Sequence, residues 1–256
     1  MITRVLATGL LAGLFAGLAI ATLQSFTTTP LILAAEVYEK AADAKQGASL
    51  EIGPDMIAGG AKLILVHAAG EHHAAGAEAV EKWEPQEGLE RTLFTSTATI
   101  GTAIGFALLL LAGMLVAGDR IDERRAIAWA AAGFAVTGLA PGVGLSPELP
   151  GMAAAELGAR QVWWFAAAAA TAVGLWLALR CDNNRLRLAA VAIIIAPHAW
   201  GAPHLAEYPA TTVPAELAAR FAATSLGVQA AFWLVTGFFV GFWWRRLGGS
   251  DVSQST

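Results

Sequence analysis

The chain has 256 residues, of which 56% are hydrophobic and only 14% are charged. So few charged residues cannot cover a soluble domain of this length, and the composition predicts a protein of the lipid bilayer. A net charge of −4 without basic runs excludes nucleic acid as the expected partner. Cys181 is the only cysteine, which excludes an intrachain disulfide.

Six hydrophobic runs without charged residues follow one another along the chain. Each approaches or exceeds the roughly twenty apolar residues that cross a bilayer. They predict an all-α integral membrane protein, with six transmembrane helices in a single membrane domain over residues 1–256. The expected helices cover about 5–28, 92–117, 126–145, 161–180, 187–203 and 220–244. An even number of spans places both termini on the same side.

The first hydrophobic run admits two interpretations. Arg4, an apolar stretch and Ala19-Ile20-Ala21 are typical of a cleaved signal peptide. The run is long for a signal core, however. Gly9, Gly13 and Gly17 recur at every fourth residue, which suits close packing against another membrane helix. We expect a retained helix, and cleavage would leave five spans without changing the side of the following segment.

A long acidic loop, residues 31–90, separates the first two expected spans. Its first part, Leu31 to Lys45, is compatible with a helix that extends beyond the membrane. Basic residues in short loops collect on the cytoplasmic side. The short loops between the later spans leave only Arg160 and Arg220 on one side, so this side and the loop 31–90 are expected to be extracytoplasmic. The other side, with both termini, holds nine arginines: Arg4, Arg120, Arg124, Arg125, Arg180, Arg185, Arg187, Arg245 and Arg246.

A short motif occurs three times, each time immediately before a hydrophobic run. With proline-containing turns upstream, it predicts that the six helices form three helical-hairpin repeats. In a structural interpretation, the Glu complements the positive end of a helix and pairs with the Arg four residues later. In the alternative, the ion pairs gate an outer vestibule for cations. The three copies are Glu87-Gly-Leu-Glu-Arg91, Glu156-Leu-Gly-Ala-Arg160 and Glu216-Leu-Ala-Ala-Arg220.

Histidines supply the candidate metal ligands, and all five are expected on the extracytoplasmic side. Imidazole with carboxylate suits cobalt, nickel, copper and zinc. Pro197 interrupts a helix beside His198, and irregular backbone at membrane depth occurs only where protein or a wet cavity surrounds it. For the candidates in the acidic loop, a solvated polar segment is the alternative interpretation. The candidates are His67, Glu71, His72 and His73 in the acidic loop, and His198 and His204 around the turn from Pro197 to Pro203.

Motifs of nucleotide hydrolysis and of membrane hydrolases are missing from the sequence. It contains no Gly-x-x-x-x-Gly-Lys-Ser/Thr loop, no His-Glu-x-x-His and no Gly-x-Ser-x-Gly. We therefore expect that the chain is not an enzyme and that it binds no permanent cofactor. Any transport that it performs must draw on a gradient or on a partner.

Seven segments, spread from the first hydrophobic run to the last, are more specific than any histidine spacing. They are Pro30-Leu-Ile-Leu-Ala-Ala-Glu-Val-Tyr-Glu39, Trp83-Glu-Pro85, Gly88-Leu-Glu-Arg-Thr-Leu-Phe94, Pro147-Glu-Leu-Pro-Gly151, Leu157-Gly-Ala-Arg-Gln-Val-Trp-Trp164, Pro197-His198 and Val213-Pro-Ala-Glu-Leu-Ala-Ala-Arg-Phe221. In this order they resemble the CbtA family, a predicted cobalt transporter subunit.

The resemblance implies a multi-pass subunit of cobalt uptake in the bacterial inner membrane, linked to cobalamin biosynthesis. It also implies a small partner, CbtB, with one membrane helix and its own histidines, and a homo-oligomer is the other assembly to consider. The transported ion would be Co²⁺, with Ni²⁺ or another divalent metal as alternatives. Family members often carry a His/Glu-rich outer loop, which is thin here, so emphasis shifts to His198 and the three Glu-Arg motifs. A non-transporting membrane scaffold or metal-delivery subunit is the alternative function.

Overall fold

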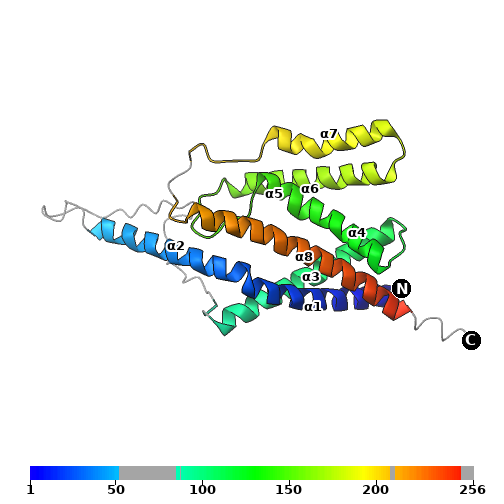
Figure 1. Cartoon of the computed structure of the whole chain (residues 1–256), viewed down its shortest axis with the longest axis horizontal. Helices are drawn as coiled ribbons and strands as arrows, with labels where there is room; N and C mark the ends of the chain where they lie inside the picture. The colour runs from blue at the N-terminus through cyan, green and yellow to red at the C-terminus, as the bar shows by residue number, and fades with distance from the viewer. Residues whose placement is uncertain (52–84, 87, 208–210, 249–256) are drawn as a thin grey trace, which may run out of the picture.

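The computed structural model describes residues 1–51, 85–86, 88–207 and 211–248, with side chains described for all of these except 43–51. Within this part, regular structure is helical and no strand occurs (Figure 1). The prediction of an all-α protein is therefore confirmed. The elements are α1 (Ile2–Phe26), α2 (Thr28–Glu51), α3 (Leu89–Val116), α4 (Glu123–Phe134), the π-helix η2 (Ala135–Leu139), α5 (Ala140–Gly144), α6 (Leu157–Arg180), α7 (Asn184–Trp200) and α8 (Ala215–Gly248).

Five helices in the described part are long and apolar enough to cross a membrane, so six spans are not confirmed. The fifth expected span, 187–203, appears as α7, which has only 17 residues. At about 1.5 Å per residue it rises roughly 26 Å, short of a hydrocarbon core about 30 Å thick. The helix stops at Gly201, whose φ of +94° places it outside helical geometry. The five are α1, α3, the continuous segment Glu123–Gly144, α6 and α8.

The expected loop 31–90 begins as a helix rather than as a loop. α1 ends at Phe26, Thr27 leaves helical geometry with φ −120° and ψ −75°, and α2 then runs from Thr28 to Glu51. Pro30 falls in the first turn of α2, where a missing N–H group costs nothing because no intrahelical acceptor is available. The helix expected for Leu31 to Lys45 is present. Residues 52–84 and 87 lie outside the described part.

α1 and α3 pack closely through the predicted glycine stripe, which is confirmed. A methyl group added at Gly13 would lie 2.3 Å from the Cα atom of Ile104, and one added at Gly17 would lie 2.6 Å from the Cα atom of Ile100. These contacts are with backbone, which cannot move aside as a flexible side chain can. The two helices therefore approach each other backbone to backbone, as small residues permit in a membrane.

α8 packs on α4 and on α1 and completes a four-helix body with α3. Gly237 and Gly241 of α8 bring its backbone against Ala126 and Glu123 of α4. At the ends of α1 and α8, the Arg4 guanidinium donates to the Trp244 carbonyl and lies 4.1 Å from the centre of the Trp244 ring. The core of this body includes the fully buried Leu111, Met114 and Val240.

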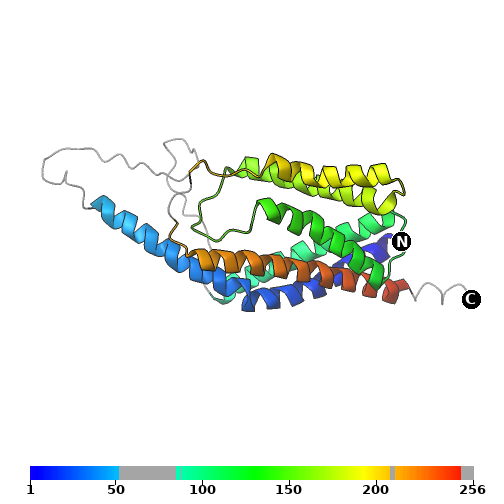
Figure 2. The same ribbon diagram turned by 45° about the horizontal axis from the view of Figure 1, so that its top comes forward.

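α6 and α7 form a second unit that lies beside the four-helix body (Figure 2). Gly174 of α6 has no side chain, so Ile194 and the Ala190 carbonyl of α7 pack closely against it. α6 contacts the body mainly through η2 and α5. Of the three predicted hairpins, only the first has two helices, α1 and α3, that pack extensively on each other. In the second, α4 packs its small residues against α8, and α6 packs its own against α7. Three self-packed hairpin repeats are therefore not confirmed.

The third expected span, 126–145, contains the π-helix η2 near its middle. Pro141 has no N–H group to donate to the Thr137 carbonyl four residues earlier, and such an interruption favours a local π-bulge. The Thr137 hydroxyl donates to the Gly133 carbonyl at 2.9 Å and accepts from the Trp233 indole at 3.1 Å. These two hydrogen bonds therefore hold Thr137 of the π-helix in place between α4 and α8.

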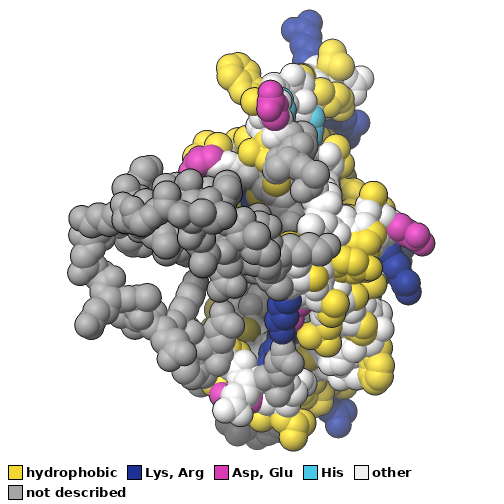
Figure 3. Space-filling model, turned by 90° about the vertical axis from the view of Figure 1, so that its left-hand side faces the viewer, with side chains coloured by type: hydrophobic (Ala, Val, Ile, Leu, Met, Phe, Trp, Pro, Cys, Tyr) yellow, Lys and Arg dark blue, Asp and Glu magenta, His cyan; other side chains and the backbone are white. Residues whose placement is uncertain are grey.

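The two ends of the bundle differ in charge. We call the end with both termini the arginine end, because its nine arginines outnumber the four acids among the described residues there, Asp119, Asp122, Glu123 and Asp182. The opposite end, here the glutamate end, is seen in Figure 3. Among its described side chains, seven glutamates outnumber four bases: Glu36, Glu39, Glu90, Glu148, Glu156, Glu207 and Glu216 against Lys40, Arg91, Arg160 and Arg220.

Candidate functional site

The second Glu-Arg motif begins α6 at the glutamate end. Glu156 is the N-cap, and its carboxylate accepts from the Ala159 and Gly158 N–H groups, each at 2.7 Å. These two hydrogen bonds, first that of Ala159, hold the pKa of the Glu156 carboxyl below its usual value. Glu156 therefore caps the N-terminus of α6 in its ionised form.

Arg160 pairs with Glu148 rather than with Glu156, which corrects the expected partner. Its Nη2 atom lies 2.8 Å from Oε2 of Glu148, and both side chains are about three-quarters buried. The carboxylate of Glu156 instead accepts hydrogen bonds from the backbone of the first turn of α6. Glu148 comes from the connection between α5 and α6, and the pair ties this connection to the start of α6.

The other two motifs are arranged differently. Arg91 of α3 makes two hydrogen bonds to Glu36 of α2, while Glu87 lies outside the described residues. Glu216 and Arg220 are both exposed at the start of α8, and neither forms an ion pair with another described residue. Among the described residues, the three motifs do not form one ring of like ion pairs.

His204 and the Arg160–Glu148 pair line one cavity of about 290 Å³, together with Met152 and Ala202. We call this cavity the entry pocket. His204 lies in the connection after α7, and its Nδ1 atom is 3.2 Å from the Ala202 carbonyl. A carbonyl only accepts, so this hydrogen bond requires the proton on Nδ1 and leaves the Nε2 lone pair available in a neutral ring. This is the tautomer in which histidine binds a metal through Nε2.

His198 occupies the last turn of α7 and packs against α6. Its ring stands edge-to-face on Trp163 with 5.6 Å between ring centroids, and it is half-buried. The Trp163 indole donates to the Pro197 carbonyl at 3.1 Å, which fixes the turn that presents the histidine. His67, Glu71, His72 and His73 lie outside the described residues. Within the described part, no three His, Cys, Asp or Glu side chains gather closely enough to form a metal centre.

Two further cavities lie in the half of the bundle nearer the glutamate end. The first, of about 530 Å³, shares Glu148 and Arg160 with the entry pocket and reaches Thr137, Gly138 and Gln229. The second, of about 460 Å³, also includes Gln229 and is lined by Gln24, Thr95, Thr99, Thr102 and Ser225.

Gln229 lies between these two cavities and contacts the π-helix. A methyl group added at Gly138 would lie 2.6 Å from the Gln229 side-chain oxygen, so the amide fills the space that this glycine leaves. Across the second cavity, the Thr99 hydroxyl donates to the Gln24 side-chain oxygen at 3.1 Å. Carboxylate, hydroxyl and amide oxygens thus occur among the mainly apolar side chains that line these cavities.

Sequence reasoning missed Glu148, Gln24 and Gln229. The two glutamines were detectable, because an amide inside a hydrophobic run needs a polar surrounding in lipid. Glu148 was not, since only the fold of the α5–α6 connection brings it to Arg160.

Comparison with known proteins identifies the family of the chain. The family model "Probable cobalt transporter subunit (CbtA)" matches residues 2–245, nearly the whole chain. No curated protein and no solved structure matches the chain. Because the match spans the described helices and both ends of the bundle, the chain belongs to the CbtA family of probable cobalt transporter subunits.

Proposed function

We propose that this chain is the membrane-spanning subunit that carries divalent cobalt inward across the bacterial inner membrane, as a supply for cobalamin biosynthesis. The observation that carries the proposal is the row of cavities from the entry pocket to Gln229, in which neighbouring cavities share lining residues. A closed, fully packed bundle would offer a cation no such row. The arginine end is cytoplasmic in this scheme, because basic residues favour that side.

The entry pocket performs the first step of this scheme. The glutamate-rich surface raises the local concentration of cations. The Nε2 atom of His204 and the carboxylate of Glu148 then replace water ligands of the metal, a donor pair that suits Co²⁺ and Ni²⁺. Arg160 competes with the metal for Glu148, so arrival of the ion loosens the tie between the α5–α6 connection and α6.

Deeper in the bundle, neutral oxygens replace the charged ligands. Gln229 and the hydroxyl groups around Thr99 offer weak ligands, and weak binding lets an ion leave again. The core around Leu111 and Met114 closes the half nearer the arginine end. In this proposal the described conformation is assigned to an outward-facing state, and inward release would require α6 and α7 to move relative to the four-helix body.

A small single-helix subunit of the CbtB kind is the proposed partner, with its histidines adding the metal ligands that the entry pocket lacks. A second copy of this chain is the alternative. One observation favours a non-transporting scaffold or metal-delivery subunit instead: the described residues hold no complete metal centre. In that case the ion pairs would only brace the helices.

Cobalt accumulation in cells tests the proposal. Cells without their own cobalt uptake would express the chain alone or together with the single-helix partner. We expect Glu148→Gln and His204→Ala to reduce accumulation several-fold at equal membrane abundance. Glu216→Gln is the matched control, because it removes an exposed glutamate from the same end. Unchanged accumulation in both pocket variants would favour the scaffold function.

A further inference from the structure

A further groove of about 540 Å³ runs along the opposite half of the bundle, between the four-helix body and α6, and it shares Phe106 and Thr137 with the cavities described above. It is lined almost entirely by aliphatic and aromatic side chains. They come from α3, α4, η2, α6 and α8, and include Leu109, Ala132, Val136, Ala172 and Leu175. Away from its polar end, such a lining offers few ligands to a metal ion, so we do not assign this groove to the proposed cation path.

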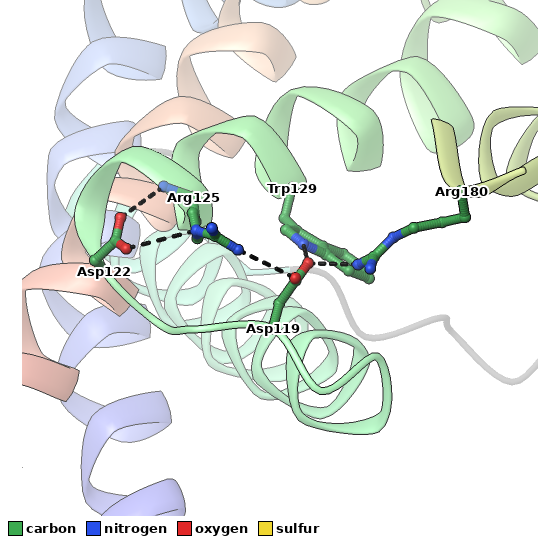
Figure 4. A network of polar contacts seen from close by, with 5 residues as sticks. All are labelled: Asp119, Asp122, Arg125, Trp129 and Arg180. Atoms are coloured by element: carbon green, nitrogen blue, oxygen red, sulfur yellow. Dashed lines mark hydrogen bonds and ion pairs between the residues drawn. The ribbon is translucent and has the colours of Figure 1, made fainter. Parts of the chain in front are cut away.

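One end of the groove is polar and lies at the arginine end. Asp119, in the connection between α3 and α4, accepts from the Trp129 indole at 2.8 Å and from Arg180 at 2.5 Å. Arg125 lies 3.3 Å from the other carboxylate oxygen, and it also pairs with Asp122. Figure 4 shows these side chains converging on Asp119 from α4 and from the end of α6. Asp119 thus holds an indole and two guanidinium groups in fixed positions.

Arg180 retains most of its hydrogen-bond donors for a further partner. A guanidinium has five N–H groups, and the hydrogen bond to Asp119 uses one. The side chain is 37% exposed, and its guanidinium lies 5.1 Å from the centre of the Trp176 ring and 5.9 Å from that of Trp129. Arginine with tryptophan at the end of a membrane helix marks headgroup depth. The remaining donors match the geometry of a phosphate.

We propose that this groove binds an anionic phospholipid, with an acyl chain along the apolar lining and the headgroup phosphate on Arg180. Charge complementarity favours an anionic lipid, since nine arginines outnumber the four described acids at this end of the bundle. The sparse packing of α6 on the body gives the lipid a structural role. The acyl chain would fill the space that remains between α4 and α6 beyond the contact of Trp129 with Trp176.

The test uses the full chain, purified in detergent and stripped of lipid. Native mass spectrometry and thermal unfolding are followed during titration with phosphatidylglycerol or with phosphatidylcholine. We expect phosphatidylglycerol to remain bound and to raise the unfolding temperature more than phosphatidylcholine does. Equal effects of both lipids would overturn the proposal, since they would report acyl-chain contact without headgroup recognition.

Two pairs of variants locate the site. Arg180→Gln should weaken phosphatidylglycerol binding roughly fivefold, the effect of about 1 kcal/mol for one arginine near a lipid surface. Arg185→Gln, exposed in the first turn of α7, should not. Ala172→Trp fills the groove, whereas Val173→Trp places the same bulk on an exposed neighbouring position outside it.

Binding that survives both Arg180→Gln and Ala172→Trp would overturn the site. A dimer, or a complex with the single-helix partner, that is lost only in Ala172→Trp would also overturn it, because a protein would then occupy the groove. None of these measurements depends on cobalt transport, so the proposal can fail independently of the proposed function.

Discussion

The guanidinium of Arg160 lies 2.8 Å from the carboxylate of Glu148, and this pair forms one wall of the entry pocket. The two residues are twelve positions apart and belong to different structural elements. The contact therefore links the α5–α6 connection to the first turn of α6 at the mouth of the proposed cation path.

Exchanging the two charges tests this contact. Glu148→Arg and Arg160→Glu should each lower stability by about 0.5–1 kcal/mol, as is usual for partly exposed pairs, because each leaves two like charges together. The double exchange should recover most of that loss. Unfolding in detergent gives the coupling energy. A coupling near zero would mean that the pair does not hold the connection. If Glu148 also binds metal, the double variant should stay impaired in cobalt accumulation.

The Glu-Arg motif shows where sequence reasoning stops. The local pattern correctly indicated a helix start, because N-capping by Glu156 depends only on its own first turn. The arginine partners were not predictable, since Glu148 and Glu36 approach from segments that the tertiary fold brings near. A repeated motif of five residues therefore specified repeated helix starts and did not specify repeated ion pairs.

A glycine pair distinguishes packed from open helix faces. Gly13→Ala should lower stability by roughly 1–3 kcal/mol, because its methyl group would lie 2.3 Å from the backbone of Ile104. Gly101→Ala is the matched control on α3, where nothing lies within 4 Å of an added methyl group. It should be neutral or slightly stabilising through helix propensity. Equal unfolding temperatures for the two variants would contradict the close α1–α3 contact.

The glycine stripe was predictable because a four-residue period in one run identifies one helix face. The partner of each later helix was not. α4, α6, α7 and α8 all have small residues, and the choice of α8 for α4 and of α7 for α6 depends on which faces fit. The length of α7 also escaped prediction, because its hydrophobic run continues past Gly201 into a connection that is not helical.

Gly138 offers a test of the glutamine at mid-bundle. Gly138→Ala would place a methyl group 2.6 Å from the Gln229 side-chain oxygen and push the amide out of its place beside the π-helix. We expect a several-fold loss of cobalt accumulation at normal membrane abundance. Gly227→Ala is the control on α8, with nothing within 4 Å of the added methyl group. If Gly138→Ala and Gly227→Ala accumulate cobalt equally, Gln229 does not line the path.

Acid should weaken the contact between α2 and α3. The hydrogen bond from Arg91 holds the pKa of the Glu36 carboxyl below its ordinary value of 4.5, with a smaller contribution from Lys40. A lowered pKa means that the contact stabilises the fold above about pH 4.5 and loses that effect as the pH falls through the folded-state pKa. Glu36→Gln should thus lower the unfolding temperature at pH 7, and the difference from the unmodified chain should shrink on acidification. In an Arg91→Gln background, Glu36→Gln should cause a smaller loss at pH 7. A difference that stays constant from pH 7 to pH 4 would show that the ion pair does not stabilise the start of α3.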